Sequence, residues 1–247
     1  MSDTAAGFQM EFGFDQGDSS VGGRSNRFKG ETGRVYRMSF AWWLGLENGK
    51  PDLDQVTPKF VGADTHYIPG VGYFINKGPE YTKIAGASPK KRIATPVILW
   101  PVDNKGNLDK SRLASGDCEV KVWIFSSDKY SSLKQIHAEF PFGQHDITVS
   151  CSDTQYQKMT FSPCKENLFR NLLGNPKAKP IVDGIILEAQ KIVANIQNDV
   201  GRDMTVQQIQ EKMAGGTGAA SGFTGGSPAG GAVTGQIDDL MDGLLDT

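Results

Sequence analysis

Polar and apolar residues alternate along several short segments in the middle of the chain, a pattern typical of β-strands that bury one face. In residues 34–46 this alternation places Tyr36, Met38 and Phe40 on a single face. Further segments of this kind are residues 71–76, 92–100, 118–126, 146–151 and 156–161. Turn signals such as Pro69-Gly70 separate these segments. Short strands at this spacing predict a small barrel or sandwich.

Helical periodicity appears between and after these strands. A helix is expected over about residues 128–139, and residues 181–199 form an amphipathic pattern. Its apolar stripe contains Ile185, Ala189, Ile192 and Ile196. A shorter helix is expected over 205–213. The predicted fold is mainly β with C-terminal helices, in which residues 24–180 form the body and 181–213 form a helical extension packed on it.

The C-terminal part has the composition of a linker followed by a recognition peptide. Residues 214–235 are Gly-rich, with nine Gly and no charge between positions 215 and 235, so we expect a flexible linker. Residues 236–247 alternate acidic and large apolar side chains. The alternative, a purely solubilising tail, leaves these apolar side chains unexplained. The expected partner contacts are Asp238, Asp239, Leu240, Asp242, Leu244, Leu245 and Asp246.

The formal net charge of -2 conceals an uneven distribution. Residues 1–23, expected to be a flexible acidic segment, carry four acidic residues and no basic one. Residues 24–180 carry 23 Lys+Arg and 15 Asp+Glu, whereas 181–247 carry three basic and nine acidic residues. All four Trp and all six Tyr also lie within 24–180. A basic, aromatic-rich body combines cations for phosphates with rings for bases, as single-strand binding requires.

Two segments are candidates for such contacts. In residues 118–126, Trp123 and Phe125 share a face with Lys121, opposite an apolar face. Either bases stack on this aromatic pair, or a second layer, such as the 181–199 helix, covers it. The run Ser88-Pro89-Lys90-Lys91-Arg92 precedes another apolar strand, and is typical either of a phosphate contact or of a solvated turn.

The sequence contains no recognisable catalytic, metal or membrane signature. Cys118, Cys151 and Cys164 lack the paired spacing of a zinc site, and His137-Ala138-Glu139 with Pro163-Cys164 lacks the last ligand of a zinc deaminase motif. The longest apolar stretches fall short of the ~20 residues of a membrane helix. We therefore expect a non-enzymatic protein with no cofactor or metal, located in a reducing cytoplasm.

Residues 90–173 resemble the OB-fold core of the replication single-stranded DNA-binding (helix-destabilising) proteins of large tailed bacteriophages. The resemblance depends on the order of four features: the basic run 90–92 leading into the strand 94–102, the strand 119–125 with Tyr130 in the following helix, the hairpin 146–161, and the acidic tip. Two departures are evident. The region 60–88 has one His and no Cys, so the family's zinc module is not expected, and residues 1–23 are acidic where the family has a basic arm for cooperative binding.

The resemblance implies an OB-fold-like small barrel that binds single-stranded DNA in a basic and aromatic cleft. The predicted phosphate contacts are Lys90, Lys91, Arg92, Lys121, Lys129, Arg34 and Arg37, and the predicted base-stacking residues are Trp123, Phe125, Tyr130 and Trp43. The acidic tail is expected to recruit phage replication proteins such as a polymerase, a helicase/primase or recombination factors.

The resulting prediction is a sequence-independent single-stranded DNA-binding protein for phage replication, recombination and repair in the infected host's cytoplasm. It is expected to be a monomer off DNA that can self-associate on it. The alternative is a phage structural or assembly protein with a β-rich body and an adaptor tail. That alternative predicts extended apolar oligomerisation strands rather than basic, aromatic ones.

Overall fold

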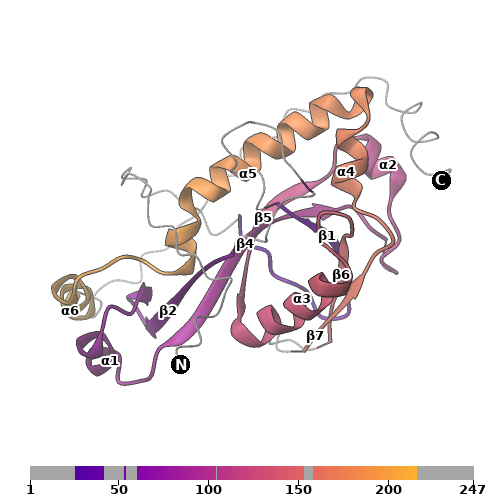
Figure 1. The fold of residues 1–247 in the computed structure, drawn as a ribbon. Helices are drawn as coiled ribbons and strands as arrows, with labels where there is room; N and C mark the ends of the chain where they lie inside the picture. The colour runs from indigo at the N-terminus through magenta and orange to yellow at the C-terminus, as the bar shows by residue number, and fades with distance from the viewer. Residues whose placement is uncertain (1–25, 42–52, 54–59, 104, 153–157, 216–247) are drawn as a thin grey trace.

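The computed structural model describes residues 26–41, 53, 60–103, 105–152 and 158–215, and these form a mixed β and α structure (Figure 1). The strands are β1 (Val35–Phe40), β2 (Val61–Ile68), β3 (Gly72–Ile75), β4 (Lys90–Trp100), β5 (Glu119–Ser126), β6 (Ile147–Cys151) and β7 (Met159–Pro163). The helices are α1 (Pro79–Ala85), α2 (Lys110–Ala114), α3 (Ser127–Glu139), α4 (Leu168–Leu173), α5 (Lys179–Val200) and α6 (Val206–Gly215), with a 3-10 turn at Pro176–Ala178.

The seven strands form one antiparallel open sheet organised around β4. Their order is β3-β2-β4-β1-β6-β7, and β5 pairs with the other edge of β4. The first half of β4 pairs with β2, with Lys90 opposite Thr65, and its second half pairs with β1, with Trp100 opposite Arg37. Since β4 is eleven residues long, it can serve both partners in succession.

The predicted strands and helices are confirmed, with shifted ends. The segment 34–46 contains β1, whose described continuation ends at Ala41, and 156–161 corresponds to β7, which begins at Met159. The helices expected at 128–139, 181–199 and 205–213 are α3, α5 and α6. Strand β2 was not predicted.

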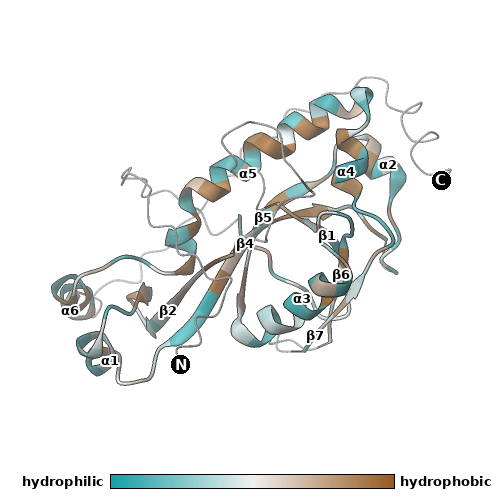
Figure 2. Cartoon of the chain, in the orientation of Figure 1, coloured by the Kyte–Doolittle hydropathy of each residue, from teal (hydrophilic) through white to brown (hydrophobic). Residues whose placement is uncertain are grey.

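The amphipathic helix α5 packs along the sheet. Its buried stripe contains the predicted Ile185, Ala189, Ile192 and Ile196. The second half of this helix packs on the outer face of β4 and β5, where Ala94 and Val122 meet it. Figure 2 shows apolar and hydrophilic residues alternating along α5, and a hydrophilic segment at the beginning of β4.

The expectation that Trp123 and Phe125 stand on a face away from the core is wrong. Trp123 is 1% exposed and Phe125 is 6% exposed. The Trp123 ring lies 6.3 Å from that of Phe40 and 5.8 Å from that of Phe161, inside the main core. The alternation along β5 is as predicted, but both faces of the strand are buried, because α5 covers Val122 on the opposite one.

A second, smaller core lies under the β2–β3 hairpin. Phe74 of β3, Tyr81 of α1 and Ile209 of α6 are buried together there. The Tyr81 hydroxyl donates to the Met204 carbonyl at 3.0 Å, which ties α1 to the segment between α5 and α6. In the part of the chain that the structure describes, no helix is long and apolar enough to cross a membrane.

Candidate nucleic-acid interface

Two tyrosines stand side by side on the β2–β3 hairpin. Tyr67 and Tyr73 are directly opposite each other in the strand register, and their ring centroids are 4.8 Å apart with a 46° tilt. Tyr67 is 56% exposed and Tyr73 is 42% exposed. Neighbouring exposed rings form an aromatic surface with a polar edge, and such surfaces commonly contact ligands.

Arg92 lies against this pair from β4. Its guanidinium carbon lies 3.6 Å from the centroid of the Tyr73 ring, a cation–π contact. The same guanidinium donates to the Val200 carbonyl at the C-terminal end of α5, where a cation also complements the helix dipole. Burial lowers the pKa of Arg92 to about 10, so the side chain is still a cation at neutral pH.

Lys90 adds an exposed cation on the same face of the sheet. It lies opposite Thr65 in the register, two residues from Arg92 along β4 and diagonal to Tyr67. Diagonal cross-strand neighbours are roughly 7–8 Å apart. Among the described residues, Lys90 has no ion-pair partner, whereas the nearby Arg27 pairs with Asp199 at 2.9 Å. We call Tyr67, Tyr73, Lys90 and Arg92 the tyrosine platform.

The position of the platform follows from where α5 ends. The outer face of β4 is apolar at Ala94, which α5 covers, and becomes cationic at Arg92 and Lys90. The helix stops at Val200, and the chain then runs closely over the hairpin, since a Cβ on Gly201 would lie 3.1 Å from Thr65 Cγ2. The platform is therefore the part of this outer face that lies beyond the helix.

The other predicted phosphate contacts lie elsewhere. Lys91 is in register with Asp64, on the opposite face of β2 and β4 from Arg92. Lys121 pairs with Glu119 at 3.0 Å and lies opposite Val97, five residues along β4 from Arg92 and thus roughly 17 Å away. Lys91 and Lys121 both point to the face opposite that of Lys90 and Arg92, so the structure does not bring the whole basic run and Lys121 together in one groove.

The two predicted arginine contacts have protein partners. Arg37 pairs with the fully buried Asp146 at 3.0 Å, and its own side chain is only 13% exposed. Arg34 is exposed, pairs with Glu31 at 3.0 Å and lies 5.6 Å from the Tyr36 ring centroid.

On α3, Lys129 is partly exposed and Tyr130 packs edge-on against Phe60, with centroids 5.2 Å apart. Trp43 and the predicted tail contacts 238–246 lie outside the described residues. Of the predicted site residues, Lys90 and Arg92 are therefore the two that belong to the platform.

Sequence reasoning missed both tyrosines of the platform. Pro69-Gly70 was recognised as a turn, but no strand was assigned before it. Gly62 and Asp64 interrupt the apolar pattern of β2. A hairpin centred on this turn places Tyr67 opposite Tyr73. The turn with a tyrosine on each side of it was therefore the sequence signal that could have predicted this pair.

The described residues also contain buried titratable groups. Asp146 accepts hydrogen bonds from Ser39, from Arg37 and, at 3.2 Å, from the backbone N–H of Leu168. Burial raises the pKa of the Cys118 and Cys164 thiols to about 11, which keeps them protonated at neutral pH. No group of three or more His, Cys, Asp or Glu within the described ranges could hold a metal ion.

No protein-family model, no curated protein and no solved structure matches this chain.

Proposed function

We propose that the chain is a non-enzymatic, sequence-independent single-stranded DNA-binding protein acting in phage DNA replication, recombination and repair. The observation that carries this proposal is the tyrosine platform, in which two exposed rings lie beside Lys90 and Arg92 on one sheet face. Rings that stack on bases, with cations for the backbone, are the two components of single-strand binding.

The strand connectivity supports an OB-fold-like barrel. Strand β1 pairs with β4 and β6, β4 pairs with β5, and β6 pairs with β7. Helix α3 lies between β5 and β6 in the chain. In this interpretation, β1, β4, β5, β6 and β7 are the five barrel strands, and β2, β3 and α1 form an insertion between the first two. OB-folds bind oligonucleotides on their second and third strands and adjoining loops, and Arg92 and Lys90 stand on the equivalent of the second strand.

The acidic tip 236–247 is, in this proposal, a recruitment peptide for replication partners in the infected cell. The alternative of a phage structural or assembly protein has less support, because the tyrosine platform presents two exposed tyrosines beside the exposed Lys90 of β4 rather than an extended apolar strand.

A titration with fluorescein-labelled oligo-dT tests the proposal. The chain should bind the single strand, and log K should fall linearly with log[salt], because released counterions accompany each phosphate contact. A duplex of the same length should bind more weakly, since its bases are already stacked. Absence of binding at low salt, or equal binding at low and physiological salt, would contradict the proposal.

A further inference from the structure

We infer that Tyr67 is the ring on which a base stacks, and that Tyr73 and Arg92 hold this ring in place without contacting phosphate. The inference rests on the proposed function and divides the platform into two roles. It changes the role of Arg92, which the sequence suggested as a phosphate ligand, into that of a positioning residue.

Arg92 occupies one face of the Tyr73 ring. With the guanidinium carbon of Arg92 3.6 Å from the ring centroid, no base can enter between them, because stacked planes already need about this separation. The side of Tyr73 facing its neighbour is limited by Tyr67, 4.8 Å away. Tyr67 has the larger exposed fraction, 56% against 42%, and is therefore the more accessible of the two rings.

The Arg92 guanidinium is already engaged by two partners within the protein. It donates to the Val200 carbonyl and stacks on Tyr73. Burial also lowers its pKa, and a side chain desolvated in this way is poorly placed to offer two parallel N–H groups to a phosphate. Lys90, exposed at the beginning of β4, is the platform's cation for the backbone.

Backbone hydrogen bonds and the smaller core hold the hairpin that carries Tyr67. The backbone N–H of Arg202 donates to the Tyr73 carbonyl at 3.0 Å, and the N–H of Ile75 donates to the Arg202 carbonyl at 3.0 Å. Beneath the hairpin, Phe74 is fully buried against Tyr81 and Ile209. A ring on such a support loses little conformational entropy when a base stacks on it.

The expected ligand is an unpaired stretch of nucleic acid, because an exposed ring can stack only on a base whose face is free. Stacking is tolerant of base identity, since every base has a π-face. Nothing in this arrangement selects a particular base.

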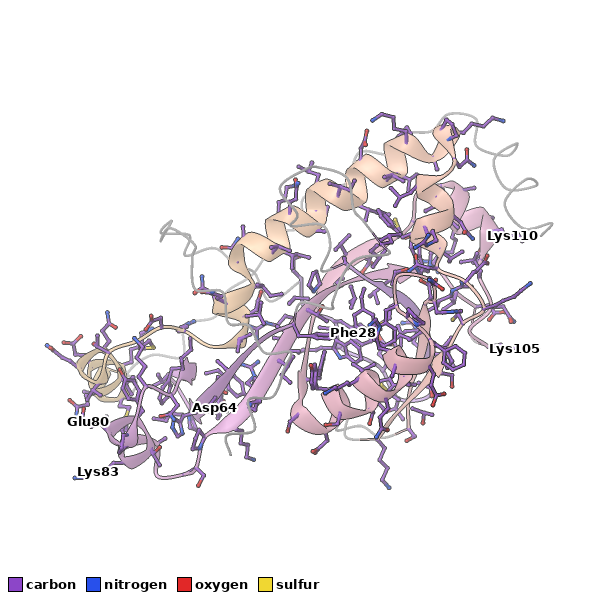
Figure 3. All side chains as sticks on the ribbon, in the orientation of Figure 1. Phe28, Asp64, Glu80, Lys83, Lys105 and Lys110 are labelled. Carbon is purple, nitrogen blue, oxygen red and sulfur yellow. The ribbon has the colours of Figure 1, made fainter. Side chains whose placement is uncertain are left out.

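The experiment measures oligo-dT affinity and its salt dependence for the full-length chain and for variants of the platform. Tyr67→Ala should weaken binding about 5- to 150-fold with an unchanged log–log salt slope, and Tyr67→Phe should bind like the wild type because the ring remains. Lys90→Gln should make the slope less steep by about 0.7. Lys83→Gln, on α1 at the outside of the molecule (Figure 3), is the control and should leave the slope unchanged.

Variants of Arg92 show whether this residue positions the tyrosines or contacts phosphate. Both Arg92→Gln and Arg92→Lys should weaken binding with the slope unchanged, because a lysine cannot replace the planar stack on Tyr73. In the Tyr67→Ala background, Arg92→Gln should cause little additional loss, which is the coupling expected if Arg92 acts through that ring. Thermal unfolding of each variant verifies that it is folded at the assay temperature.

Three outcomes would overturn the inference while leaving the proposed function standing: wild-type affinity in Tyr67→Ala, rescue by Arg92→Lys, or a slope change in Arg92→Gln equal to that in Lys90→Gln. If the wild-type chain itself does not bind the oligonucleotide, the proposed function fails, and the inference fails with it.

Discussion

The buried carboxyl of Asp146 should make the stability of the fold depend on pH in a direction that the structure specifies. Asp146 is fully buried, and its Oδ2 lies 3.0 Å from Arg37 Nε. Burial raises the pKa of Asp146 from 3.8 to about 6, and the Arg37 charge and the hydrogen bonds from Ser39 and Leu168 offset part of that rise. Burial therefore has a larger effect on the pKa of Asp146 than the ion pair with Arg37 has.

This raised pKa determines the sign of the effect. Between pH 3.8 and about 6, Asp146 holds a proton in the native state that it releases in the unfolded chain. The stabilisation of the native state by this proton is therefore fully present below pH 3.8 and is lost as the pH rises through 6. A gap of about two pKa units corresponds to a loss of about 3 kcal/mol in the free energy of unfolding. Asp146→Asn removes this titration. It also leaves Arg37 without its charge partner at every pH, so the informative quantity is the trend.

Urea unfolding of both proteins at pH 4, 5, 6 and 7 measures that trend. The stability of Asp146→Asn relative to the wild type should improve by about 2.4 kcal/mol between pH 4 and pH 7, with little further change above about pH 7. A difference in stability that stays constant with pH would refute the reasoning, and so would one that changes in favour of the wild type as the pH rises. The latter would mean that the Arg37 charge outweighs burial and lowers the pKa of Asp146.

Two further predictions concern α5 and the tryptophan in the core. Ile196→Ala removes a side chain that is 3% exposed at the contact between α5 and the sheet, and should cost about 2–5 kcal/mol in chemical denaturation. Leu187→Ala, on the same helix but 55% exposed, should change stability by less than about 0.5 kcal/mol, and equal losses would contradict the packing described. Because Trp123 is 1% exposed, any change in tryptophan emission that oligo-dT produces should persist in Trp123→Phe. Its disappearance in that variant would place a base against Trp123.

The regular elements were largely predictable because their patterns are local. The apolar run of β4 and the stripe of α5 from Ile185 to Ile196 are each long enough to determine the type of element. Strand β2 was missed, because Gly62 and Asp64 break the alternation and its stability comes from pairing with β3 and β4. Such tertiary support is not visible in the residues of the strand itself.

The candidate site was less predictable, for a different physical reason. Alternation separates the two faces of β5 but does not show which of them is buried. In the structure both are: α5 covers one face, and the other, which carries Trp123, packs into the main core. Counting charges likewise cannot tell a phosphate ligand from a structural cation. Arg37 and Lys121 are both basic residues on strands, yet each has an acidic partner within 3.0 Å.

Arg92 links the two uses of the outer sheet face. Towards the middle of β4 this face is apolar, and α5 covers it with Ile192 and Ile196; towards the beginning of β4 it carries Lys90 and faces the tyrosines. At the boundary, one guanidinium satisfies the terminal Val200 carbonyl of the helix and stacks on Tyr73. The end of α5 at Val200, with Gly201 close to the hairpin, therefore coincides with the boundary between the covered apolar part of this face and the exposed tyrosine platform.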